Sequence, residues 1–115
     1  MKIVINRKHG GFNLSEEAVL LYGDKKNLNI IAKQDEKIKT ITRYYFNEVK
    51  EENGFGEWEI ERNDPVLVEV VEQLGDLANG YYSKLKVVEV PDDIKWYSSD
   101  YDGIEEVHEE HRKWS

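Results

Sequence analysis

Two histidines near the C-terminus, His108 and His111, are the first side chains in this sequence that could carry out chemistry. A zinc peptidase motif reads H-E-x-x-H, whereas this segment reads HEEH and is one residue too short. On a helix the two rings would share a face, but on a strand they would point to opposite sides. The spacing implies no third ligand, and zinc sites need three or four ligands. A solvated, charged terminus is therefore favoured over a metal site, and no metal is expected.

Scarce arginines beside aromatic residues give the second signal. The chain has only four arginines, Arg7, Arg43, Arg62 and Arg112. Arg112 lies close to Trp114, and Arg43 precedes Tyr44. Guanidinium groups bind phosphates in a bidentate manner and aromatic faces stack on bases, so this pairing suits a nucleotide-like ligand. The alternative is that each arginine forms salt bridges with some of the 24 acidic residues, as surface charges usually do.

A third signal is the pair Gly10 and Gly11, which leads into a helix expected from Ser15. Backbone N–H groups at such a helix start can bind a phosphate, and Arg7 would add positive charge. The letters GGF lack the spacing of a P-loop or of a dinucleotide fingerprint. A plain strand-to-helix turn is therefore the favoured reading of this loop.

Support for catalysis is weak. The sequence contains no G-x-S-x-G elbow, and with no cysteine it has no thiol nucleophile. The acids Asp100, Asp102 and Glu105 crowd an expected hairpin, where carboxylates are usually solvated. No nucleophile–base pair follows from spacing, so a non-enzymatic function without a cofactor is favoured over a small hydrolase.

Composition sets further bounds. The 115 residues carry a formal net charge of −8, with 39% hydrophobic and 35% charged residues. This balance is typical of a folded, soluble domain, and no apolar run approaches the roughly 20 residues that span a bilayer. The start lacks the apolar core of a signal peptide. We therefore expect a cytoplasmic protein without membrane contact, and the negative charge argues against direct binding to nucleic acid.

The hydrophobic pattern predicts the elements that must position these residues. Residues 14–23 and the segment that follows Asp64 and Pro65 predict helices, the second with a buried stripe that includes Leu74 and Leu77. Gly75 lies inside that second helix, where it could allow close contact with a strand. Residues 28–32 allow a short strand within a mostly polar connection, and alternation of apolar and polar residues predicts strands at 2–6, 38–49, 58–61, 85–90, 94–100 and 104–108. A helix over IEEVHEEH is the alternative for the last of these strands.

The predicted order is β-α-β-β-α-β-β-β, without repeats or a linker. Consecutive strands with only two helices between them predict an α+β fold. We expect residues 1–115 to form a single small domain, with a mostly antiparallel sheet and two helices packed on one face.

Three stretches of the chain read "KIVIN…GGF-LS-EA", "R-DP-LV-VVE-LG--ANG" and "LKVVE-PDD--W…YDGIE-V-E-HR-W", at residues 2–18, 62–80 and 85–114. Together they resemble a family of small, largely uncharacterised bacteriophage and prophage proteins. The resemblance implies a phage origin and contributes no catalytic residues. By analogy, small phage proteins include anti-defence factors, some of which are oligomers that sequester cyclic nucleotide or ADP-ribose-type immune signals.

The resemblance gives weight to the C-terminal His111, Arg112 and Trp114, as either a ligand grip or a structural latch. The favoured function is sequestration of a nucleotide-derived ligand. Its phosphate would be held by Arg112 and Arg62, and its base would stack on Trp114 or Tyr82.

The main rival function is an acidic inhibitor of a host defence protein or nucleic-acid-binding protein. Because a short chain forms a deep pocket more easily between protomers, a homo-oligomer built from symmetric dimers is expected in the host bacterial cytoplasm.

Overall fold

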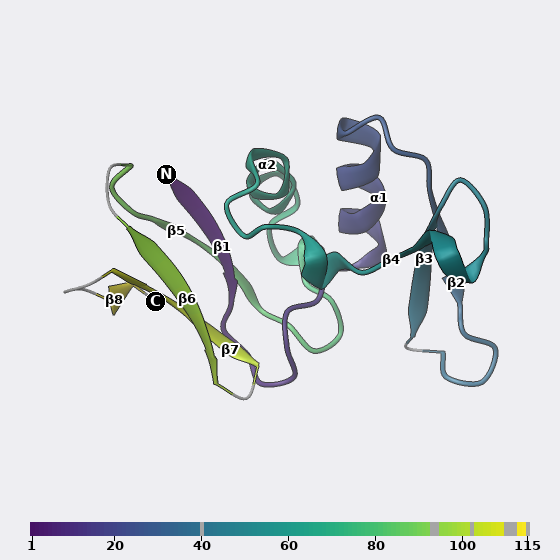
Figure 1. Ribbon diagram of the computed structural model, residues 1–115. Coiled ribbons are helices and arrows are strands. Elements are labelled where there is room, and N and C mark those ends of the chain that lie inside the picture. Colours follow the sequence, from purple (N-terminus) through teal and green to yellow (C-terminus); the bar gives the residue numbers. More distant parts are fainter. Residues whose placement is uncertain (40, 93–94, 102, 110–112, 115) are drawn as a thin grey trace.

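The computed structural model describes residues 1–115 except 40, 93–94, 102, 110–112 and 115 (Figure 1). Its helices are α1 (Glu16–Lys25) and α2 (Pro65–Leu74), with short 3-10 turns η1 (Glu51–Asn53), η2 (Glu57–Glu59) and η3 (Gly75–Ala78). The strands are β1 (Lys2–Asn6), β2 (Ile30–Gln34), β3 (Thr42–Phe46), β4 (Gly54–Phe55), β5 (Leu85–Glu89), β6 (Trp96–Tyr101), β7 (Ile104–Glu109) and β8 (Lys113–Trp114).

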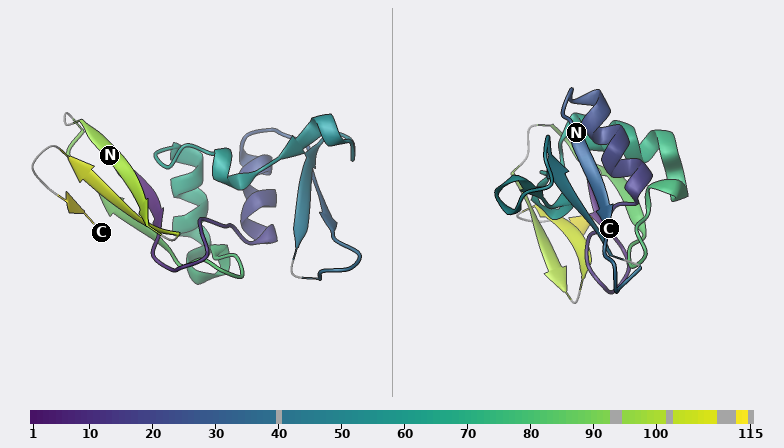
Figure 2. Two further views of the ribbon diagram at one scale, coloured as in Figure 1. Left: turned by 60° about the horizontal axis from the view of Figure 1, so that its bottom comes forward. Right: turned by 90° about the vertical axis from the view of Figure 1, so that its right-hand side faces the viewer.

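The described strands pair in antiparallel fashion and form three sheets, β1-β5, β2-β3-β4 and β6-β7-β8. Figure 2 shows them as successive layers, with both helices between β1-β5 and β2-β3-β4 and with β6-β7-β8 outside β1-β5. The layers stack along the long dimension of the molecule, 46 Å against 29 and 26 Å. The predicted α+β class is confirmed, although the strands divide among three sheets rather than one.

Helix α1 begins after Ser15, whose Oγ accepts a hydrogen bond from the Ala18 N–H at 3.1 Å. The predicted helix at 14–23 is thus shifted, because Leu14 instead forms an isolated β-bridge with Asn79. Gly23 does not end the helix. A Cβ added there would lie 2.7 Å from Ile30 Cδ1, so this glycine lets β2 approach the helix closely.

Helix α2 begins as predicted, because Asp64 Oδ1 accepts from the Val66 N–H at 2.8 Å and Pro65 occupies the first turn. It ends earlier than predicted, at Gly75, which has a φ of +57°. The idea that Gly75 allows a close strand contact is wrong, since no atom lies within 4 Å of an added Cβ. Leu77 falls in the 3-10 turn and is 63% exposed, so it leaves the predicted buried stripe.

Two predicted strands differ in the structure. The strand predicted at 38–49 is limited to β3, and the strand predicted at 58–61 is wrong, since η2 occupies residues 57–59. There the Gly56 N–H donates to Glu59 Oε2 at 3.3 Å, which favours a turn. The strand that follows β3 and pairs with it is β4, which lies before the predicted segment 58–61. The predicted hairpin of β6 and β7 around Gly103 is confirmed, and the helical alternative for that segment is wrong.

Two hydrophobic clusters lie between these layers. The larger one joins the helices to β1 and β3, and includes Val4, Tyr22, Tyr44 and Leu67. The smaller one lies between β1-β5 and β6-β7, and includes Val107. Successive residues of β1 therefore point into different clusters, and Ile3, Val4, Ile5 and Asn6 are all fully buried. No helix among the described residues has the length and hydrophobicity to cross a membrane.

Candidate ligand-binding groove

A buried ion pair joins Arg62 to Glu105 on β7. The Arg62 Nε lies 3.3 Å from Glu105 Oε2 and 3.4 Å from Oε1, and its Nη2 donates to Oε2 at 3.1 Å. The two side chains are only 15% and 7% exposed. The guanidinium also lies 3.6 Å from the centre of the Phe12 ring, a cation–π contact. This buried pair ties the β6-β7 hairpin to the rest of the fold.

The Nη1 group of Arg62 is also in use. Its Nη1 donates to the carbonyls of Ile60 at 2.9 Å and Trp58 at 3.3 Å. A ligand phosphate would have to displace Glu105 and leave a buried carboxylate unpaired, which is costly. The predicted phosphate-binding role of Arg62 stays a prediction, and this geometry assigns the side chain a structural role.

Asn6, at the end of β1, completes what we call the junction, the group Asn6, Arg62, Gly103 and Glu105. Its N–H donates to Glu105 Oε1 at 2.9 Å. Its side-chain Nδ2 donates to the carbonyls of Lys8 at 2.7 Å and Gly103 at 2.6 Å. The side chain is fully buried and fully hydrogen-bonded. The expectation that Glu105 is solvated at the hairpin is wrong, because its side chain is buried and paired with Arg62. Asn6 was not predicted as a site residue, and a polar residue that directly follows a buried apolar run was the available signal for it.

The Gly10-Gly11 loop packs on the junction. Both glycines have positive φ, +121° and +102°. A Cβ on Gly103 would lie 2.3 Å from the Gly11 nitrogen, so the loop and the β6-β7 turn meet backbone to backbone. Arg7 Nη1 donates to the Glu105 carbonyl at 2.9 Å. The structure thus brings together Arg7, Gly10, Gly11 and Arg62 as predicted site residues, in contacts that stabilise the fold.

The C-terminal candidates are only partly described. His111 and Arg112 lie outside the described residues, so their predicted ligand grip stays a prediction. Trp114 lies in β8, whose backbone pairs with β7 opposite Val107. His108 has its Nε2 2.8 Å from Ser99 Oγ, and its ring stacks on Tyr97. Within the described part of the chain, no three side chains of the metal-binding types come together.

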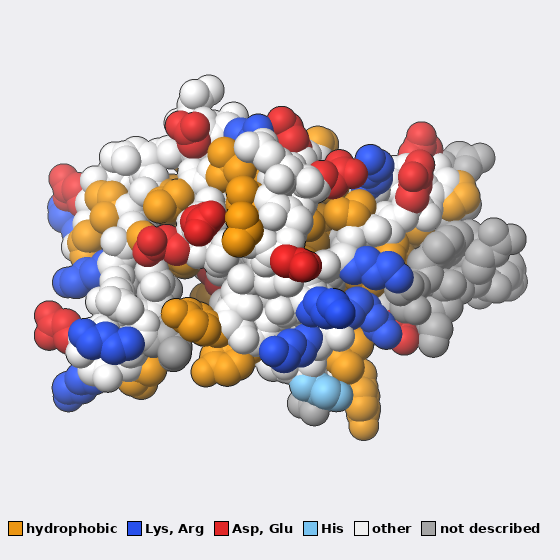
Figure 3. Space-filling view, turned by 180° about the vertical axis from the view of Figure 1, so that it is seen from behind, with side chains coloured by type: hydrophobic (Ala, Val, Ile, Leu, Met, Phe, Trp, Pro, Cys, Tyr) orange, Lys and Arg blue, Asp and Glu red, His pale blue; other side chains and the backbone are white. Residues whose placement is uncertain are grey.

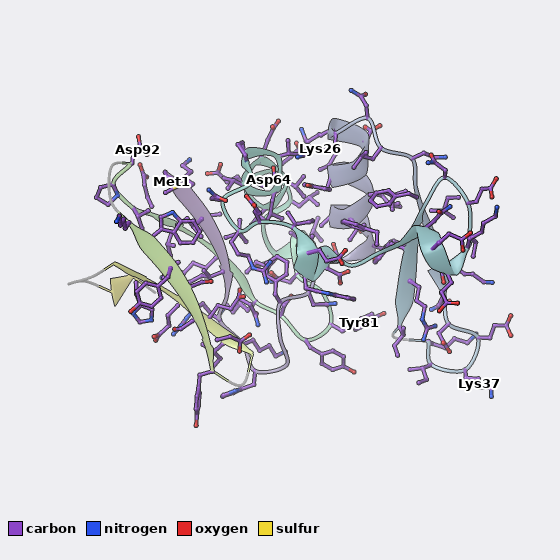
Figure 4. The ribbon with its side chains drawn as sticks, in the orientation of Figure 1. Met1, Lys26, Lys37, Asp64, Tyr81 and Asp92 are labelled. Atoms are coloured by element: carbon purple, nitrogen blue, oxygen red, sulfur yellow. The ribbon has the colours of Figure 1, made fainter. Side chains whose placement is uncertain are left out.

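An open groove of about 1240 Å³ lies elsewhere, between the β2-β3-β4 sheet and the loops at 13–16 and 79–82. Exposed aromatic residues line it, namely Trp58, Tyr81 and Tyr82, at 65%, 69% and 55% exposure. Figure 3 shows a hollow where the β2-β3 hairpin meets the body, with hydrophobic side chains beside it. Tyr81 lies on the side of the body that faces the hairpin (Figure 4). Among the predicted site residues that the structure describes, Tyr82 lines this groove.

Cationic side chains line the hairpin side of the groove. They are Lys39, Arg43 and Lys50. Arg43 Nη1 lies 2.5 Å from Asp35 Oδ2. The hydrogen bond from Arg43, with those from the backbone of Ile38 and Lys37, lowers the pKa of Asp35 to about 2. Unlike Arg62, Arg43 has a side chain that is 56% exposed, so it can still reach a ligand.

Glu57 lines the groove at its inner wall and is only 6% exposed. Its Oε1 accepts from Asn13 Nδ2 at 3.0 Å, which ties η2 to the loop before α1. Burial raises the pKa of Glu57 above its ordinary value, despite the hydrogen bonds to its carboxylate. Tyr44 beside it is also buried, and burial raises its pKa. This wall is therefore a rigid support for the exposed aromatic side chains.

Trp58 and Tyr81 were not predicted as site residues. Each is a large aromatic residue in a polar, turn-rich segment, and that position was the available signal. No family model matches this chain, and no match was found among curated proteins or solved structures. The resemblance to bacteriophage proteins therefore stays a prediction, and the groove must be interpreted from its own chemistry.

Proposed function

We propose that this protein is a non-enzymatic binding protein that takes a small nucleotide-type ligand in the groove between the β2-β3-β4 sheet and the body. One observation carries the proposal. Exposed aromatic faces and three cationic side chains line the same groove, beside the carboxylates of Glu16, Glu51, Glu57 and Glu59. A nucleotide combines a planar base with anionic phosphates, and these are the two features that such a lining recognises.

The aromatic part of the groove supports base stacking. Trp58, Tyr81 and Tyr82 are each more than half exposed, and aromatic side chains exposed side by side are uncommon outside binding surfaces. Tyr81 and Tyr82 lie on one short loop, with ring centres 6.5 Å apart. Stacking on aromatic side chains does not require a particular base, so a range of nucleotides would bind.

The cationic part supports phosphate binding. Lys39 and Arg43 come from the hairpin, across the groove from the tyrosine loop. The groove volume of about 1240 Å³ exceeds the roughly 300–1,000 Å³ of an ordinary small-molecule site. It therefore suits a ligand with two nucleotide units, such as a cyclic dinucleotide or an ADP-ribose derivative, better than a single nucleoside.

Glu57 favours binding over catalysis. Its carboxylate accepts hydrogen bonds from Asn13 and from the chain itself, so it is held as a structural anchor. In the proposed setting the protein acts in the host bacterial cytoplasm as a phage protein that sequesters an immune signal. Symmetric dimers remain part of this proposal, because a second copy would cover an open groove.

The rival function is supported by the net charge of −8. An acidic inhibitor would dock on a cationic surface of a host defence protein or nucleic-acid-binding protein, without using the groove. Charge of this kind speeds association and fixes partner choice more than it sets affinity.

Calorimetry with cyclic ADP-ribose, ADP-ribose and cyclic dinucleotides tests the proposal. We expect binding by at least one of them, and Tyr81→Ala should weaken it by about 1–3 kcal/mol, the value of one stacked base. Tyr101→Ala is the matched control, because Tyr101 is 81% exposed and lies on β6 away from the groove. If no nucleotide binds the wild type, the proposal fails and the acidic inhibitor takes its place.

A further inference from the structure

A second cleft of about 480 Å³ shares Trp58 with the proposed nucleotide groove and is otherwise lined by different residues. Its aromatic walls are Trp58 and Trp96, and its polar lining includes Glu61, Arg62 and Glu105. The cleft therefore combines two indole rings with two carboxylates and one guanidinium.

The fold positions these two walls firmly. Trp96 and Ser98 lie two residues apart on β6, so their side chains share one face of the sheet. Ser98 pairs with Val107 of β7, and Trp96 packs against the cluster that contains Val107. The opposite wall belongs to residues 58–63, which the Arg62–Glu105 pair holds against the same hairpin. The buried ion pair thus holds the segment that carries Trp58 to the β6-β7 hairpin that carries Trp96.

The charges in the cleft favour a cation. Arg62 and Glu105 neutralise each other through their three contacts of 3.1–3.4 Å. Glu61 then leaves one net negative charge, and within the described part of the chain no cation pairs with it. An anion is disfavoured, because the Arg62 donors are already directed at Glu105 and at backbone carbonyls.

We propose that the cleft between Trp58 and Trp96 binds an organic cation, namely a quaternary or alkylated ammonium group. Indole faces attract such cations through the ring quadrupole, and paired aromatic walls are how methylated ammonium groups are recognised. Glu61 adds a carboxylate at the rim. An alkylated ammonium group is weakly hydrated, so it loses little when it leaves water for this cleft.

The test is an NMR titration with choline, followed through the indole N–H signals of the tryptophans. Its neutral carbon isostere, 3,3-dimethylbutan-1-ol, is the chemical control. Choline should shift the Trp58 and Trp96 signals, and the neutral isostere should bind about tenfold more weakly, on the scale of a desolvated cation–π contact. Equal binding of the two compounds, or no shift with choline, overturns the proposal.

Variants separate this cleft from the groove. Trp96→Phe should weaken choline binding several-fold, and Glu61→Gln about threefold, the scale of an exposed charge interaction. Glu52→Gln, which removes one exposed charge outside the cleft, should change nothing. Tyr81 lines the groove and not the cleft, so Tyr81→Ala should leave choline binding unchanged. If Tyr81→Ala abolishes choline binding while Glu61→Gln does not alter it, the cation binds in the groove and the proposal is wrong.

Discussion

The junction around Arg62 and the groove around Arg43 place the same residue type beside aromatic side chains, with opposite results. Arg62 is 15% exposed, stacks on Phe12 and pairs with Glu105 at the centre of the fold. Arg43 is 56% exposed and pairs with Asp35 on the hairpin, at the edge of an open groove. The first arrangement uses its donors to stabilise the protein, whereas the second keeps them within reach of a ligand.

The difference between the two regions lies in desolvation. A buried guanidinium must be fully paired, because an unpaired buried charge costs several kcal/mol. An exposed guanidinium keeps its water and contributes little to stability, so it can exchange its partner for a phosphate. Adjacency of arginine and aromatic residues in the sequence does not distinguish the two states, and burial does.

The largest expected effect is on the buried pair. Glu105→Gln should lower the free energy of unfolding by about 3 kcal/mol or more, because it leaves the Arg62 charge without its partner. Asp35→Asn is the matched control at the exposed pair and should have a much smaller effect. Urea denaturation of both variants measures the difference. Equal losses would show that the two pairs do not differ as described.

The close contact between Gly103 of the junction and Gly11 of the neighbouring loop should give the next largest effect. Gly103→Ala combines a φ of +89° with a Cβ placed 2.3 Å from the Gly11 nitrogen, so we expect a loss of about 2 kcal/mol or more. Gly11→Ala has a similar φ of +102° but no atom within 4 Å of its Cβ. It should lose only about 1 kcal/mol, from backbone strain. Thermal melts would contradict this account if Gly11→Ala were the more damaging change.

The aromatic partner of the junction should have a moderate effect. Phe12→Leu keeps an apolar side chain but removes the ring face 3.6 Å from the Arg62 guanidinium. We expect a loss of about 1 kcal/mol in unfolding free energy, the scale of a partly desolvated cation–π contact. Tyr82→Leu, at an exposed ring of the groove, should be close to neutral in the same denaturation assay.

The smallest effect concerns pH at the wall of the groove. Burial raises the pKa of Glu57 above its ordinary value of 4.5, so the folded state holds this proton more tightly than the unfolded state. The contribution of Glu57 to stability therefore falls as pH rises from about 4.5 through the raised pKa, and is constant above it.

Glu57→Gln should remove that dependence. The stability of the wild type relative to this variant should decline over the same pH window, as measured by denaturation at a series of pH values. Glu52→Gln, at an exposed carboxylate, is the control and should show no such trend. A constant difference between wild type and Glu57→Gln would contradict the role given to burial.

Local signals in the sequence determined much of the secondary structure. Ser15 and Asp64 accept the first hydrogen bonds of α1 and α2, as their positions predict, and Gly103 forms the turn between β6 and β7. The η2 segment could not be predicted in this way. Alternation in WEIE is typical of a strand, but Glu59 bonds to the Gly56 N–H and turns the chain instead. The local hydrogen bond between the Glu59 side chain and the Gly56 backbone therefore outweighed the alternating pattern of apolar and polar residues.

For the candidate site, the sequence by itself determined which residue types were present: few arginines, several aromatic residues and an excess of acids. Only the tertiary structure decided their use. Glu105 lies 43 residues from Arg62 along the chain, and no spacing rule joins them. That long-range pairing buries Arg62, whereas Arg43, Tyr81 and Trp58 stay exposed at the groove. The sequence does not decide between these outcomes, because only the folded chain determines which side chains lose their water.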